Sequence, residues 1–217
     1  MSPSVLYLHG FTSSPTGEKA TRLRELLTPR GIRFNAPDLN VPSVEALDFD
    51  QMVERALDAA RVEAPEVVVG SSLGSLVALE VIRRGIHQPA VLIAPALGVA
   101  VHWIDHVAPG DPVLLYEGTE DECRVHRRFF EGMKTVTCDD RAPATEVTIF
   151  MGREDESVPF EKVREVWEGW AGSGLLVPGS RFVEIEGGDH SLAGSMELVA
   201  TEIQRRAGVR RVERAVI

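Results

Sequence analysis

The segment Gly70-Ser71-Ser72-Leu73-Gly74 is where residue types and spacing point most directly to chemistry, because it has the form G-x-S-x-G. A β-branched run, Val67 to Val69, precedes it, and helical apolar spacing follows it. Between a strand and a helix, this pattern predicts a tight turn that holds a nucleophilic serine. The glycines are needed because side chains there would collide with the neighbouring strand or helix. We therefore expect the Ser72 hydroxyl at the amino end of a helix, where the dipole and free amides favour negative charge.

A serine hydroxyl is a weak nucleophile until a base takes its proton, and His190 is the candidate base. It ends the segment Glu186-Gly187-Gly188-Asp189-His190, after a predicted strand that ends at Ile185 and before the last predicted helix. Because parallel strands all end at one edge of their sheet, His190 and Ser72 should meet there. The neighbouring Asp189 could tune the histidine, but a carboxylate beside a glycine pair is more often a turn former, and we interpret it so.

Asp155 is the candidate acid that orients the imidazole and stabilises its cation. It follows a predicted strand that ends at Met151. Its position gives the chain order serine, aspartate, histidine that accompanies this kind of serine turn. Glu154 and Glu156 are adjacent carboxylates, so spacing alone leaves them as alternatives.

Two backbone amides are candidates for an oxyanion hole, the pair of donors that stabilises negative charge on a reacting carbonyl oxygen. One is the amide of Leu73, directly after the serine, and the other is that of Phe11, in the loop after the first predicted strand. Gly10 permits a close backbone approach in that loop. The Phe11 ring would line the acyl pocket, and His9 would form bonds within the loop.

These candidates need a scaffold that brings them to one edge, and the hydrophobic pattern predicts one. Six short apolar runs are predicted as strands: 5–8, 32–36, 66–70, 90–94, 147–151 and 182–185. Five segments with helical apolar spacing are predicted as helices: 18–27, 44–60, 73–83, 160–170 and 192–206. This alternation predicts an α/β fold, with a mostly parallel six-stranded sheet flanked by helices.

The segment 98–140 is too long for an ordinary connection between two strands, and we interpret it as a lid-like insertion. The whole chain, 1–217, is expected to form a single domain. Trp103, Phe129 and Phe130 of the insertion, together with Phe11, are candidates for the substrate pocket.

Three segments resemble the small YqiA/YcfP-like esterases of the α/β-hydrolase superfamily: Leu6 to Pro15 with Lys19 and Ala20, Val69 to Gly74, and Glu186 to His190. The resemblance implies a reduced hydrolase sheet that lacks the superfamily's first two strands. It also implies esterase or thioesterase activity on acyl substrates. Two features depart from the family: Ser75 stands where a second glycine commonly follows the serine turn, and segment 98–140 matches poorly. The poor match concerns the segment that would shape the acyl and leaving-group pockets.

Charge and composition argue against several classes of function. Lys plus Arg is 23 against Asp plus Glu at 33, a formal net charge of −10, which disfavours nucleic acid and anionic membrane surfaces as partners. The sequence has no run of the roughly 18 apolar residues that a membrane span needs, and no export signal is expected. Cys123 and Cys138 are expected to be reduced thiols of a cytoplasmic protein. No metal or organic cofactor is expected, and the chain is expected to be a monomer or homodimer.

Together these residues predict a serine hydrolase that cleaves a small-molecule acyl ester through an acyl-enzyme, with Ser72, Asp155 and His190 as the catalytic triad. A thioesterase or a peptidase would use the same triad, so both are alternatives. A non-catalytic binding protein on the same scaffold is a third alternative, because a fold alone does not establish activity.

Overall fold

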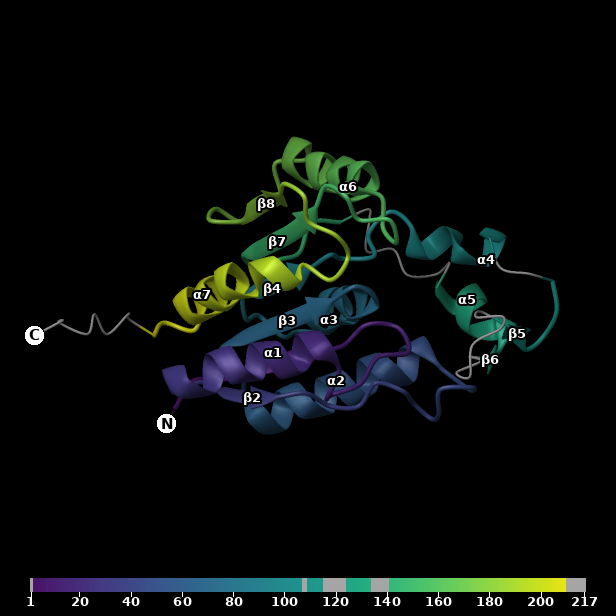
Figure 1. The fold of residues 1–217 in the computed structure, drawn as a ribbon, viewed down its shortest axis with the longest axis horizontal. Helices are drawn as coiled ribbons and strands as arrows, with labels where there is room; N and C mark the ends of the chain where they lie inside the picture. Colours follow the sequence, from purple (N-terminus) through teal and green to yellow (C-terminus); the bar gives the residue numbers. More distant parts are fainter. Residues whose placement is uncertain (1, 107–108, 115–123, 134–140, 210–217) are drawn as a thin grey trace, which may run out of the picture.

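Six parallel strands form the central sheet, in the order β2-β1-β3-β4-β7-β8 (Figure 1). The computed structural model describes residues 2–106, 109–114, 124–133 and 141–209. The strands are β1 (Ser4–Leu8), β2 (Arg33–Asn35), β3 (Val67–Ser71), β4 (Ala90–Ile93), β7 (Val147–Gly152) and β8 (Arg181–Ile185). All six predicted strands are confirmed, and so is the α/β class.

The four central strands form from apolar runs, richest in valine in β3, that are covered on both faces. Every residue of β1, β3, β4 and β7 is buried. Their register pairs apolar residues across the sheet, with Val5 beside Val67 and Val69 beside Val91. The edge strands β2 and β8 are partly exposed, because each has a neighbouring strand on one side only.

Helices cover both faces of the sheet. Two helices, α1 (Glu18–Leu27) and α7 (Met196–Arg206), lie side by side on one face (Figure 1). The helices α2 (Phe49–Glu63) and α3 (Leu73–Arg83) pack together on the other face. The helix α6 (Phe160–Gly172) covers the β7–β8 end, where the rings of Phe160 and Phe182 meet edge to face with centroids 5.9 Å apart.

A buried ionic network fixes the end of α7, the helix that follows the His190 loop. The guanidinium of Arg206, only 2% exposed, donates to a Glu202 carboxylate oxygen at 2.9 Å and to the Thr148 hydroxyl at 2.9 Å. It also donates to the Gly179 carbonyl at 2.8 Å and pairs with Glu146. A buried guanidinium needs such a full set of acceptors, since an unpaired buried charge is strongly destabilising.

Two predicted helices begin later than the apolar pattern indicated, while α1 and α3 begin and end where predicted. The helix predicted from Val44 begins at Phe49, because the Asp48 side chain accepts from the Gln51 amide at 3.0 Å and caps the helix there. The last helix begins at Met196 instead of Leu192. The backbone of Leu192 has a φ of 50°, which no α-helix allows, and a 3₁₀ turn follows it.

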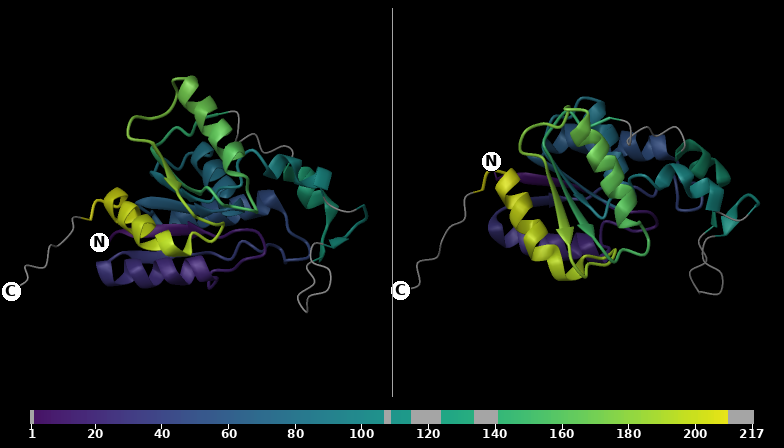
Figure 2. Two further views of the ribbon diagram at one scale, coloured as in Figure 1. Left: turned by 45° about the horizontal axis from the view of Figure 1, so that its top comes forward. Right: turned by 90° about the horizontal axis from the view of Figure 1, so that it is seen from above.

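The predicted lid segment follows β4 at the carboxyl end of the strands. Its described elements are α4 (Trp103–His106), β5 (Val113–Leu114), β6 (Arg124–Val125) and α5 (Arg127–Met133). Both views of Figure 2 show these elements beyond the end of the sheet. The β5–β6 hairpin was not predicted, because two-residue strands have no readable periodicity. Residues 107–108, 115–123 and 134–140 of the segment, with Cys123 and Cys138, lie outside the described residues.

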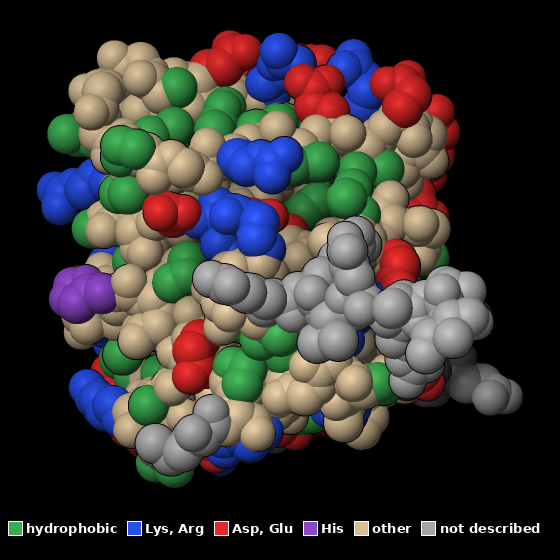
Figure 3. Space-filling view, turned by 90° about the vertical axis from the view of Figure 1, so that its left-hand side faces the viewer, with side chains coloured by type: hydrophobic (Ala, Val, Ile, Leu, Met, Phe, Trp, Pro, Cys, Tyr) green, Lys and Arg blue, Asp and Glu red, His purple; other side chains and the backbone are tan. Residues whose placement is uncertain are grey.

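The opposite end of the molecule carries the start of β1 and the end of α7 (Figure 1). On that face, Lys and Arg side chains are interspersed with Asp and Glu side chains and with small apolar areas (Figure 3). Among the described residues, no helix is both long enough and apolar enough to cross a membrane.

Candidate active site

Ser72 occupies the sharp turn between β3 and α3. Its φ of 52° and ψ of −120° lie in a region that non-glycine residues seldom adopt, so the backbone here is strained. The Ser72 amide donates to the Ile93 carbonyl at 2.9 Å, which anchors the turn to β4. Strain of this kind concentrates at functional sites, where the surrounding structure must enforce it.

The two flanking glycines provide the space for this turn. A Cβ at Gly74 would lie 2.1 Å from the Leu8 carbonyl oxygen, and one at Gly70 would lie 2.5 Å from the Ser75 Cα. Both distances are impossible for real side chains, and the neighbouring atoms belong to the backbone, so only glycine fits.

Ser75, the departure from the family pattern, is fully buried, and its hydroxyl has no hydrogen-bond partner within the described ranges.

Asp155 and His190 form a direct pair. The His190 Nδ1 lies 2.8 Å from Asp155 Oδ2, and the Asp155 side chain has no exposed surface. The other carboxylate oxygen of Asp155 accepts from the amides of Ser157 at 2.9 Å and Val158 at 2.8 Å. Because an ionised carboxylate only accepts hydrogen bonds, Nδ1 carries the proton and Nε2 is left as the basic nitrogen.

Close backbone packing brings the acid and base loops together. A Cβ at Gly152, the last residue of β7, would lie 2.2 Å from the Gly188 carbonyl oxygen. That same carbonyl accepts from the Glu154 amide at 2.9 Å. The side chains of Glu154 and Glu156 are exposed, so of the three adjacent carboxylates the structure brings Asp155 to the histidine.

The loop after β1 lies against the serine. A Cβ at Gly10 would be 3.2 Å from the Ser72 Cβ and 3.8 Å from its hydroxyl oxygen, so the next amide, of Phe11, is close to the nucleophile. His9 holds this loop, because its Nδ1 donates to the Gly10 carbonyl at 2.9 Å and its Nε2 accepts from the Leu39 amide at 2.9 Å. No acceptor for the Phe11 amide is found within the described ranges.

Ser72 and His190 open into the same pocket, with a volume of about 520 Å³. Its wall contains Tyr7, Gly10, Phe11, Ser13, Glu18, Lys19, Ser71, Trp103, Ser157 and Ser191. Of the four aromatic residues predicted for the substrate pocket, Phe11 and Trp103 line it, with ring centroids 5.8 Å apart. Phe129 and Phe130 lie behind Phe11, with centroids at 5.5 Å and 6.2 Å, and they support the wall from outside.

Two residues of this wall have displaced pKa values. Burial raises the pKa of the Tyr7 hydroxyl to about 12, against an opposing hydrogen bond with Ser71. Burial lowers the pKa of Lys19 to about 8, against the attraction of Asp155, Asp189 and Glu18. The sequence did not single out either residue for its chemistry. For Lys19 a signal existed, because the first turn of a helix favours acidic residues over cations.

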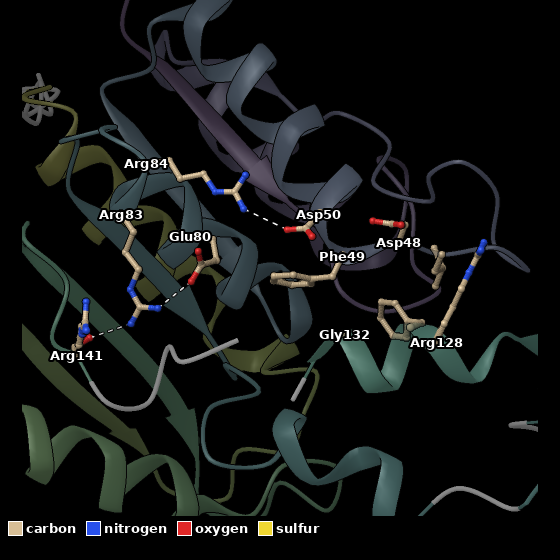
Figure 4. A pocket seen from close by; sticks show the side chains of 11 residues that line it. Asp48, Phe49, Asp50, Glu80, Arg83, Arg84, Arg128, Gly132 and Arg141 are labelled. Carbon is tan, nitrogen blue, oxygen red and sulfur yellow. Dashed lines mark hydrogen bonds and ion pairs between the residues drawn. The ribbon is translucent and has the colours of Figure 1, made fainter. Parts of the chain in front are cut away.

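A second cavity, with a volume of about 390 Å³, lies between α2, α3 and the helix α5 of segment 98–140 (Figure 4). Its charges are largely paired: Arg84 binds Asp50 at 3.2 Å, and Arg83 binds Glu80 at 2.8 Å. It has neither a serine nor a histidine in its wall. Its link to the first pocket is Phe129, which lines this cavity and stacks on Phe11.

Metal-ligating side chains do not gather at either pocket. Within the described ranges, no three His, Cys, Asp or Glu side chains lie close enough together to hold a metal ion.

Solved structures of several hydrolases share this fold. Est1E from Butyrivibrio proteoclasticus, determined with ferulic acid bound, matches with a TM-score of 0.75 at 17% identity, over 94% of this chain and 87% of that one. The esterase domain of a Rhodothermus marinus protein matches with a TM-score of 0.70 at 19% identity, over 94% and 88%. The monoacylglycerol lipase of Paleococcus ferrophilus matches with a TM-score of 0.69 at 17% identity, over 96% of each chain. The chain therefore has the α/β-hydrolase fold, as its resemblance implied.

A comparison with protein families identifies the chain more narrowly than its fold does. A family model matches residues 4–198, and the chain belongs to that family, the uncharacterised protein family UPF0227. The resemblance to YqiA/YcfP-like esterases is confirmed by this match. A search of curated proteins finds no match.

Gly74, two residues after Ser72, provides a test of the turn geometry. We expect Gly74→Ala to lower the free energy of unfolding by about 2–4 kcal/mol, because the new methyl group would overlap backbone atoms of β1 that cannot move aside. Urea denaturation measures this change. Gly169→Ala in α6, where a methyl group meets no atom within 4 Å, should instead raise stability by about 0.5–1 kcal/mol. Equal stability of the two variants would contradict the close packing of the turn.

Proposed function

We propose that this protein is a serine hydrolase that cleaves carboxylic esters through an acyl-enzyme, with Ser72, Asp155 and His190 as its catalytic triad. The observation that carries the proposal is the Asp155–His190 pair, at 2.8 Å, in the wall of the pocket that also contains the strained Ser72. A buried carboxylate that binds Nδ1 leaves Nε2 free to accept a proton, which is the arrangement that activates a serine hydroxyl.

The proposed reaction has two halves. In the first, His190 Nε2 takes the proton from the Ser72 hydroxyl as its oxygen attacks the carbonyl carbon and forms a tetrahedral intermediate. The imidazolium then protonates the leaving alkoxide, the bond to the alcohol breaks, and an acyl-serine forms. In the second half, His190 takes a proton from water, the hydroxide attacks the acyl carbon, and the proton returns to Ser72 as the acid leaves.

The amides of Phe11 and Leu73 are the proposed oxyanion hole. The Leu73 amide begins α3 and so lacks an intrahelical acceptor, while Gly10, the residue before the Phe11 amide, packs against Ser72. In other serine hydrolases, loss of one such donor raises the barrier by roughly 3 kcal/mol. The positive end of α3 would add to the same stabilisation.

The pocket favours a small acyl ester as the substrate. The rings of Phe11 and Trp103 form an apolar wall suited to an acyl or aromatic group, while hydroxyls, Glu18 and Lys19 line the rest. A solved structure of the same fold holds ferulic acid, and another is a monoacylglycerol lipase, which supports a carboxylic ester. We further propose that segment 98–140 acts as the lid of this pocket and that the single-domain enzyme works without a metal or organic cofactor.

Selective labelling of Ser72 tests the proposal. A fluorophosphonate probe should label the wild-type protein and Ser157→Ala, but not Ser72→Ala, because only a serine activated by a base attacks phosphorus. Gel fluorescence and intact mass measure the labelling, and p-nitrophenyl esters of increasing acyl length measure turnover. Thioester and peptide substrates in the same panel separate the two alternative activities. A folded wild-type protein that takes up no label would contradict the triad and favour the non-catalytic binding protein.

The acid of the triad predicts a separate kinetic effect. We expect Asp155→Asn to lower kcat for a short p-nitrophenyl ester by about 10³- to 10⁴-fold, because an amide does not hold the imidazole in the required tautomer. Asp189→Asn is the matched control, since an asparagine oxygen can still accept from the Ser191 and Leu192 amides that Asp189 now binds. Comparable losses in the two variants would show that Asp155 has no special role.

A further inference from the structure

Lys19 makes an unusual contact with the backbone of the proposed base. It is the second residue of α1, and its Nζ donates to the His190 backbone carbonyl at 2.6 Å across 171 residues of sequence. No other donor to that carbonyl is found in the described part of the chain. The side chain also lines the pocket that contains Ser72 and His190.

This position is unfavourable for a lysine on two physical grounds. A cation in the first turn of a helix opposes the helix dipole, and the Gly17 cap contributes no side-chain hydrogen bond there. Burial removes the ammonium from water and lowers the pKa of Lys19 to about 8. Below that pH the buried charge reduces the stability of the fold. Residues that reduce stability in a pocket wall commonly serve function.

The titratable groups around Lys19 come from three elements. Asp155 faces it from the loop after β7, Asp189 and His190 from the loop after β8, and Glu18 from its own helix. The three carboxylates attract the ammonium without a direct ion pair among the described residues, while its hydrogen bond goes to the His190 carbonyl. The geometry therefore places the lysine between the two loops that carry the acid and the base.

We propose that Lys19 is a positioning residue that fixes the backbone at His190, so that the imidazole stays bound to Asp155 and directed into the pocket of Ser72. The inference rests on the proposed function, since it assigns a role within the same triad. The loop before His190 is already held by the Glu154 amide at Gly188. Lys19 holds the loop at the histidine itself, through a charge-assisted hydrogen bond.

The first test is Lys19→Met, which keeps the length of the side chain and removes the donor. We expect kcat for a p-nitrophenyl ester to fall about 10- to 100-fold with KM unchanged, because a small displacement of a catalytic base slows the chemical step. The melting temperature at pH 7 should be equal or higher, since a desolvated charge has been removed. Lys162→Met, at an exposed lysine of α6 paired with Glu165, should leave kcat unchanged.

The pH profile gives a readout that a purely structural role would not move. Wild-type kcat should fall as pH rises through about 8, because Lys19 loses its proton and the charge-assisted bond weakens. Lys19→Met should lack this alkaline fall, and Lys19→Arg, which stays protonated, should move it out of the measurable range. A wild-type kcat in Lys19→Met overturns the inference. A change in KM alone also overturns it, and so does a fall in kcat that is accompanied by a lower melting temperature.

A spectroscopic measurement separates this inference from the proposed function. In the wild-type protein, the His190 Nδ1 proton bound to Asp155 should give a downfield NMR signal protected from exchange, identified by its absence in His190→Asn. The signal should broaden or vanish in Lys19→Met. Absence of labelling and turnover in the wild-type protein would reject the hydrolase, yet this signal would still decide the role of Lys19. An identical signal in both proteins overturns that role.

Discussion

The strained backbone of Ser72 is the constraint on which the rest of the site depends. A residue with a φ of 52° and a ψ of −120° reverses the chain within one position, so β3, α3 and the end of β1 approach one another at backbone distance. Only glycine at 70 and 74 leaves room for this approach. The unfavourable dihedral angles are offset by the surrounding core, where every residue of β1, β3 and β4 is buried.

Parallel strands explain how groups from distant parts of the sequence meet around that turn. The loops after β1, β3, β7 and β8 all leave the sheet at the same edge, and each carries one element of the site: Phe11, Ser72, Asp155 and His190. Alignment of strand ends brings the loops near one another but does not fix side chains at hydrogen-bond distance. Direct backbone contacts do that, with Gly10 against Ser72 and Gly152 against Gly188.

The fold could be predicted from the sequence because its signals are strong and local. Buried β-branched runs mark the strands, and apolar spacing marks α1 and α3 to the residue. The start of α2 was missed, because the apolar spacing extends past the point where Asp48 caps the helix. The residues of the site were less accessible. Neighbours such as Glu154 and Asp155 differ by one position in sequence, yet one side chain is exposed and the other fully buried.

A contact between a side chain and a backbone carbonyl far along the chain leaves no mark in the sequence. Lys19 binds a carbonyl oxygen, a group that every residue has, so no residue type at position 190 could reveal the contact. What the sequence does contain is an anomaly, a cation where a helix favours an acid. Strain at Ser72 and burial of the Lys19 charge have the same physical character, because each lowers stability locally and each is enforced by packing elsewhere. Sites of this kind are therefore better found by asking where a sequence departs from its own structural preferences than by matching patterns alone.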